Sequence, residues 1–185
     1  MMLATVRVGV TVSFLRMEKR PRPGPALPGD VSLVRLAGCT VPFYRYLYGT
    51  VGADYCWWLR RTLSDAALGA ILRDPDVSVH VLYLGGEPAG TFEIDSRGRP
   101  AVNISYFGLL PHAVGIGMGR AFLSAAVQAA WAEGARVVTL NTCTADHPRA
   151  LPNYLDAGFL IVRRMDEVWE IPTRLGLAIP QHLMV

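Results

Sequence analysis

Cysteine and histidine are scarce in this sequence. The 185 residues include only three cysteines and four histidines, and no two cysteines form a CxxC pair. A structural zinc site needs about four clustered ligands. We therefore expect no bound metal. A sparse, odd set of cysteines also favours a reducing compartment over a disulfide framework, which predicts a cytoplasmic location.

Charged residues are also few. They make up 18% of the chain, the formal net charge is only +3, and 51% of the residues are hydrophobic. This composition excludes a disordered chain. So small a charge excess does not indicate a nucleic-acid partner, although it would suit a small anionic ligand. The length predicts one domain over residues 1–185.

Uninterrupted apolar runs are missing as well. Residues 1–12 lack a basic segment followed by a continuous apolar one, so we expect no signal peptide. Residues 109–132 are nearly uncharged and reach the ~20 residues of a spanning helix. Pro111 and three glycines interrupt this stretch. We expect a loop and then a buried helix, in a soluble protein that makes no membrane contact.

Hydrophobic periodicity is clear along most of the chain. Residues 6–14 alternate apolar with small or polar side chains, which predicts a half-buried strand. A hairpin is expected around Gly85-Gly86, with arms at 77–83 and 88–95. Further strands are expected at 101–109, 136–143 and 159–169, and helices at 64–72, 117–133, 148–158 and, as two short ones, within 40–61. This order predicts a mixed α/β domain with one or two crossover units in its C-terminal half.

The sequence VGIGMGR, at residues 114–120, lies between an expected strand and an expected helix. Glycines let backbone N–H groups approach an anion, and a helix N-terminus adds positive potential, so the loop predicts a phosphate cradle. A turn without a ligand is the other interpretation. The P-loop motif fails because Arg120-Ala121 follows the last glycine, and the dinucleotide fingerprint fails because the third glycine comes one residue early. A nucleotide-binding oxidoreductase is therefore only a weak third hypothesis.

Two longer segments resemble a known family. Residues 109–123, LLPHAVGIGMGRAFL, resemble motif A of the GNAT superfamily of acyl-CoA-dependent N-acyltransferases, and residues 147–159, HPRALPNYLDAGF, resemble its motif B. The resemblance covers residues 77–169, and residues 44–52 look like an uncharacterised bacterial subgroup. It implies a mixed, mostly antiparallel sheet flanked by helices. An acetyl-CoA-binding core would span 77–169, with an N-terminal strand and acceptor-side helices in 1–76.

The resemblance also implies acetyl-CoA as co-substrate, with its pyrophosphate on the amides of the glycine loop. Three positions depart from the family pattern: Val114 stands for Arg or Gln, His147 for the motif B Asn, and Asn103 for an acidic residue on the preceding strand. The cofactor-binding residues that the resemblance implies are Leu109, Leu110, Val114, Gly115, Ile116, Gly117, Met118, Gly119, Arg120, His147, Ala150 and Tyr154.

Catalytic roles follow from the same resemblance. Tyr154 is the expected general acid at the leaving thiolate, although a tyrosine there could simply pack a helix on the sheet. Glu93 is the first candidate for the general base, and a solvated strand glutamate is the alternative. His147 is expected to touch the cofactor or to orient its loop. A backbone N–H near Leu109 would donate to the oxyanion.

The acceptor side is predicted to include Tyr44, Tyr48 and Trp57, because aromatic rings can line an apolar or cation-binding pocket. Core or dimer-interface packing explains them equally well. The expected activity is direct transfer of an acetyl group, in a ternary complex, to a primary amine of a small molecule or peptide. The alternative is a non-catalytic CoA-binding regulatory or interaction module. A homodimer is possible, with an edge at residues 6–14 or 159–169.

Overall fold

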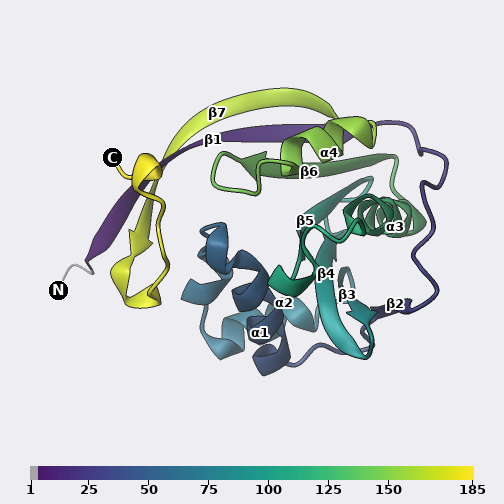
Figure 1. Cartoon of the computed structure of the whole chain (residues 1–185), viewed down its shortest axis with the longest axis horizontal. Coiled ribbons are helices and arrows are strands. Elements are labelled where there is room, and N and C mark those ends of the chain that lie inside the picture. Colours follow the sequence, from purple (N-terminus) through teal and green to yellow (C-terminus); the bar gives the residue numbers. More distant parts are fainter. Residues whose placement is uncertain (1–3) are drawn as a thin grey trace.

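The computed structural model describes residues 4–185, and Figure 1 shows their arrangement. Seven strands form one sheet in the order β2-β3-β4-β5-β6-β1-β7, in which only the β5–β6 pair is parallel. The predicted mixed, mostly antiparallel sheet is therefore confirmed. The strands are β1 (Thr5–Met17), β2 (Val31–Arg35), β3 (Val77–Leu84), β4 (Glu87–Asp95), β5 (Ala101–Leu109), β6 (Val137–Cys143) and β7 (Leu160–Pro172), and the α-helices are α1 (Val41–Val51), α2 (Asp65–Leu72), α3 (Gly119–Ala132) and α4 (Ala150–Asp156).

Local sequence signals explain most of the element ends. Ser64 begins α2 as expected, because its Oγ accepts a hydrogen bond from the Ala67 N–H at 3.2 Å. Gly158 follows α4 with a φ of +99°, a left-handed conformation that glycine adopts without strain. The helix predicted from Gly117 begins instead at Gly119, since Gly117 has a φ of +92°.

One prediction about the N-terminal half needs correction, and one strand there was not predicted. Residues 40–61 form one α-helix, α1, and two 3₁₀ turns, Gly52–Asp54 and Leu59–Thr62, rather than two helices. The edge strand β2 was not predicted at all. Its five residues are mostly exposed, so they carry little hydrophobic periodicity.

The N-terminal strand β1 lies inside the sheet, between β6 and β7 and antiparallel to both. β1 has strands on both sides only from Val12 to Arg16; before Val12 it pairs with β7 and, at Val8, forms a single bridge to Met184, while β7 is the edge strand of the sheet. Figure 1 shows β1 and β7 side by side as a long arch at one end of the sheet. The two ends of the chain thus build the same part of the fold.

Helices cover both faces of the strands at the other end of the sheet (Figure 1). On one face, Phe122 of α3 packs against Phe92 of β4 in the largest core cluster. On the other, Tyr44 of α1 and Leu68 of α2 pack with Val79 of β3. Among the described residues, no helix has the length and apolar character needed to cross a membrane.

The parallel strands β5 and β6 pair only at their beginnings, from Ala101 opposite Val137 to Asn103 opposite Thr139. Beyond these residues they diverge. A register shift in the β4–β5 ladder, with Ser105 as the extra residue, accompanies the divergence. The second half of β5 is therefore left without a neighbour on its β6 side.

Candidate active site

A cavity of about 870 Å³ occupies the gap between the diverging strands. Tyr106 to Leu109 of β5 line one wall, and Leu140, Asn141 and Cys143 of β6 line the other. The glycine loop and α4 close one end, and the segment after α1 closes the opposite end together with β1 and β7. One continuous space thus joins the glycine loop to the aromatic segment.

The glycine loop has the conformation that its sequence predicts. Gly115 has a φ of +87° and Gly117 of +92°, both in the left-handed region that other residues rarely adopt. A Cβ placed on Gly115, Gly117 or Gly119 would meet no atom within 4 Å, so this backbone faces open space. Among residues 4–185 no side chain caps the start of α3, and the first turn of this helix carries no acidic residue. Its N–H groups are therefore available to an anion.

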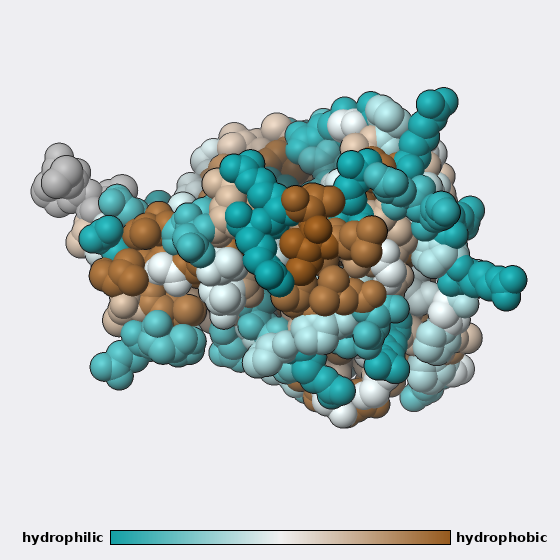
Figure 2. All heavy atoms as spheres, turned by 90° about the horizontal axis from the view of Figure 1, so that it is seen from above, coloured by the Kyte–Doolittle hydropathy of each residue, from teal (hydrophilic) through white to brown (hydrophobic). Residues whose placement is uncertain are grey.

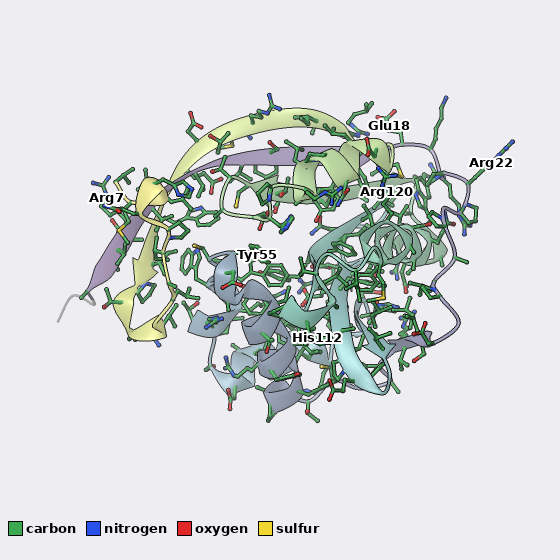
Figure 3. The ribbon with its side chains drawn as sticks, viewed as in Figure 1. Arg7, Glu18, Arg22, Tyr55, His112 and Arg120 are labelled. Carbon is green, nitrogen blue, oxygen red and sulfur yellow. The ribbon has the colours of Figure 1, made fainter. Side chains whose placement is uncertain are left out.

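The structure brings most, but not all, of the predicted cofactor residues to the cavity. Leu110 and Met118 are buried outside its lining, and Ile116 is 54% exposed and also outside it. The side chain of Arg120, which is labelled in Figure 3, forms an ion pair with Asp156 at 3.1 Å and so links the start of α3 to the end of α4. The predicted cofactor residues that do line the cavity are Leu109, Val114, Gly115, Gly117, Gly119, Arg120, His147, Ala150 and Tyr154.

Tyr154 of α4 lies in the cavity wall and is only 8% exposed. Its ring packs edge-on against Phe107 and Phe159. Within residues 4–185 its hydroxyl has no hydrogen-bond partner. Burial, and then the nearby negative charge of Asp146, raise the pKa of this phenol well above its usual range. The hydroxyl therefore stays protonated at neutral pH and can donate.

The loop between β6 and α4 presents a carboxylate and an imidazole. Asp146 accepts hydrogen bonds at Oδ2 from the Thr142 hydroxyl at 2.6 Å and the Cys143 N–H at 2.9 Å. His147 accepts at Nδ1 from the Arg149 N–H at 3.1 Å, which fixes its ring edge-on to Tyr55. Figure 3 shows Tyr55 projecting from the segment after α1 toward β6.

Cys143 lines the cavity but is a poor nucleophile. Burial, together with the negative charge of Asp146, raises the pKa of its thiol to about 12. The thiolate is the reactive form of cysteine, and at neutral pH almost none is present.

Aromatic rings form the end of the cavity opposite the glycine loop. Tyr48, Trp57 and Tyr106 contact one another with ring centroids 4.9–5.2 Å apart. Arg60 lies over the Tyr106 ring, with Cζ 5.3 Å from its centroid. The predicted acceptor residues Tyr48 and Trp57 are thus in the lining, whereas Tyr44 is not. The other aromatic side chains that line the cavity are Phe14, Tyr55, Trp58, Phe107 and Trp169.

Glu93 and Tyr44 form a buried polar cluster beside this end. Glu93 is 2% exposed, and its carboxylate accepts from the Tyr44 hydroxyl at 2.5 Å and from Nη2 of Arg60 at 2.6 Å. Burial, and then the charge of Glu93, raise the pKa of Tyr44 far above its usual range. Arg60 lines the cavity, but Glu93 does not. The role of Glu93 as a base stays a prediction.

Several lining residues are not among the predicted site residues. Arg60 and Tyr106 belong to segments that the sequence predicts near the site, but neither carries a signal of its own. Phe14, Glu167 and Trp169 come from β1 and β7, and no local signal connects these strands with the glycine loop. Only the pairing of β1 with β6 and β7 brings them to the cavity.

Comparison with known proteins agrees with this arrangement. The family model described as "Acetyltransferase (GNAT) family" matches residues 41–159. No curated protein matches the chain. Similar solved structures include a GCN5-related N-acetyltransferase from Kribbella flavida, with 18% identity and a TM-score of 0.57 over 89% of this chain and 60% of that one. Another, from Sphaerobacter thermophilus, has 17% identity and a TM-score of 0.62 over 92% of this chain and 53% of that one.

A third similar structure is an aminoglycoside acetyltransferase from an uncultured soil metagenomic sample, in complex with trehalose. It has 18% identity and a TM-score of 0.56 over 70% of this chain and 88% of that one. The chain spans 53–62% of the length of the first three similar structures. At these identities the likeness shows the fold. The family model covers more than half of the chain, and the chain therefore belongs to the GNAT acetyltransferase family.

Proposed function

We propose that the protein transfers the acetyl group of acetyl-CoA directly to a primary amine of a small molecule or peptide. The observation that carries this proposal is the continuous cavity between β5 and β6. Its glycine-loop end suits a pyrophosphate, and its aromatic end suits an acceptor. A thioester placed between them would meet the amine without a covalent enzyme intermediate.

The acetyl-CoA end is built from backbone groups. Free N–H groups at the start of α3 and the left-handed Gly115 and Gly117 would hold the pyrophosphate. Within the described part of the chain, the second half of β5, up to Leu109, has no strand partner on its β6 side. Its N–H and C=O groups can pair with the amides of the pantetheine arm as a neighbouring strand would.

The transfer needs two proton movements. The amine nitrogen forms a bond to the thioester carbon, the C–S bond breaks, the nitrogen loses a proton and the thiolate gains one. Tyr154 is the donor that we assign to the thiolate. A backbone N–H near Leu109 would donate to the oxyanion of the tetrahedral intermediate. A lysine-like amine has a pKa of ~10.4, so a base must take its proton near pH 7.

For this base the cavity wall offers Asp146. Its Oδ2 accepts two hydrogen bonds from the chain, and Oδ1 has no partner within residues 4–185. Glu93, which lies outside the lining, would instead position Arg60 at the aromatic end.

The acceptor end favours an amine attached to an apolar or aromatic group. Tyr48, Trp57 and Tyr106 offer ring faces, which attract both apolar groups and cations. Glu167 of β7 adds a carboxylate to the same lining.

A non-catalytic CoA-binding module is the second candidate. The observation that favours it is the polar but uncharged Asn103 on β5, whose Oδ1 accepts from Thr139 and whose Nδ2 donates to Ser105. This residue stands where the family often has a carboxylate.

Turnover separates the two candidates. The assay measures release of CoA thiol from acetyl-CoA with a panel of primary amines, matched in size and differing in apolar character. Calorimetry with CoA measures binding independently. Binding with acceptor-dependent thiol release supports the enzyme, binding without release for any amine supports the module, and absence of binding overturns both. Trp57→Leu should raise KM for the acceptor more than KM for acetyl-CoA.

A further inference from the structure

Strand β7 is an exposed edge of the sheet. It pairs with β1 from Leu160 to Pro172, with a bulge at Val162, and the described chain places no strand on its other side. Leu160, Val162 and Val168 are 69%, 56% and 52% exposed. Figure 2 looks down on the side where β1 and β7 lie and shows apolar surface there among hydrophilic side chains. Natural proteins usually protect an edge of this length from pairing with another chain.

The middle of β7 also carries four charges without ionic partners. Arg163 and Arg164 are followed, after Met165, by Asp166 and Glu167. Within residues 4–185 none of the four forms an ion pair. The residues opposite them on β1 are all uncharged: Phe14, Ser13, Thr11 and Val10.

We propose that β7 pairs with β7 of a second copy of this chain, antiparallel, around a two-fold axis at Met165. In a continuous antiparallel sheet with such an axis, one residue must lie opposite itself. With Met165 at the axis, Arg164 lies opposite Asp166 of the partner, and Arg163 lies opposite Glu167. Each pair occurs twice, so four pairs of opposite charges face one another.

The register is decided by the regular part of β7, from Arg163 to Pro172, because Val162 is the extra residue of a bulge in the β1–β7 ladder. Moving the axis by one residue places a like-charged pair at the axis. An axis at Arg164 places Arg164 opposite itself, and an axis at Asp166 places Asp166 opposite itself. Like charges directly opposite each other destabilise a strand pair. The charges therefore select one register.

The proposed pairing also involves a residue of the cavity wall. Glu167 lies in the cavity lining, and Nε1 of Trp169 donates to its carboxylate at 2.8 Å. In the proposed dimer the partner's Arg163 lies opposite Glu167. The second copy would thus place a cation at the β7 side of the acceptor end.

The test is the oligomeric state of charge-reversed chains, measured by light scattering and sedimentation over a range of protein concentrations. The wild type should be a dimer. Arg163→Glu with Arg164→Glu should be monomeric, because four carboxylates then face four others across the axis. Asp166→Arg with Glu167→Arg should be monomeric for the matching reason. An equimolar mixture of the two variants should dimerise again, as a heterodimer.

Controls keep this result interpretable. Circular dichroism of each variant checks that the fold is retained, and Arg22→Glu, at an exposed residue of the loop between β1 and β2, should leave the dimer intact (Figure 3). A monomeric wild type overturns the proposal. A dimer that persists in either reversed variant, or a mixture that stays monomeric although both variants are folded, overturns it as well.

Discussion

Arg60, in the cavity wall, donates a hydrogen bond from Nη2 to the buried Glu93 carboxylate at 2.6 Å. Arg60 lines the cavity, whereas Glu93 is almost completely buried. The Tyr44 hydroxyl donates a second hydrogen bond to the same carboxylate. One ion pair therefore ties the segment after α1 to the middle of the sheet, and thereby positions the aromatic end of the cavity.

Glu93→Gln should lower the free energy of unfolding by about 3 kcal/mol. The substitution leaves the largely buried Arg60 guanidinium without its counter-charge, and a buried charge without a partner is costly. Urea unfolding at pH 7 gives the value. Asp156→Asn is the matched control, since it breaks the exposed Arg120–Asp156 pair and should cost at most about 1 kcal/mol. Equal effects of the two substitutions would contradict a structural role for the buried pair.

Tyr154→Phe should lower kcat by about 100-fold or more with little change in the acceptor KM, because the leaving thiolate then lacks a proton donor. Burial raises the pKa of this hydroxyl, so the wild type should lose no activity to Tyr154 ionisation below pH ~10. Steady-state rates of thiol release over a pH series provide the measurement. Tyr46→Phe, at an exposed tyrosine of α1, is the control. An unchanged kcat across pH would remove Tyr154 from the mechanism.

Gly117→Ala should weaken CoA binding by about 10-fold or more. An alanine is strained at a φ of +92°, so the loop would have to rearrange and its N–H groups would no longer converge. Calorimetry with CoA measures the change. Gly38→Ala is the control, because its Cβ would also meet no atom within 4 Å and its φ lies outside the left-handed region. Equal affinity of the wild type and Gly117→Ala would show that the loop conformation does not hold the ligand.

Acid should destabilise the protein through His80. This residue is buried against the Phe92 ring at 4.4 Å, and burial, with Arg35 nearby, lowers its pKa from 6.5 to about 4. Between pH 6.5 and 4 the unfolded chain takes up a proton that the folded one does not, so stability falls as pH falls through this window. The loss attributable to His80 is about 2 kcal/mol at pH 5.

His80→Phe removes this titration while keeping a ring against Phe92. The difference in unfolding free energy between pH 7 and pH 5 should therefore be about 2 kcal/mol smaller in the variant than in the wild type. Urea unfolding of both proteins at both pH values tests this. The same pH dependence in both would assign the acid sensitivity to other groups.

Local patterns predicted much of the fold because they depend on neighbouring residues. The alternation along β1, the Ser64 cap and the glycine after α4 each act within a few residues, and each is confirmed. The strand β2 could not be predicted in this way, since a short, mostly exposed edge strand needs no apolar face. The position of β1 could not be predicted, because its partners Cys143 and Met165 are more than a hundred residues away.

In the candidate site, too, some features follow from the sequence alone and others only from the tertiary structure. By itself the sequence determined the glycine loop, because positive φ and free N–H groups are local properties of residues 114–120, and it determined the family through the motifs around that loop. Only the tertiary structure decided which side chains share the cavity. It buried Glu93 against Arg60, and it brought Glu167 beside the aromatic rings. The physical reason is that burial and counter-charges arise from contacts between distant segments, which no local pattern records.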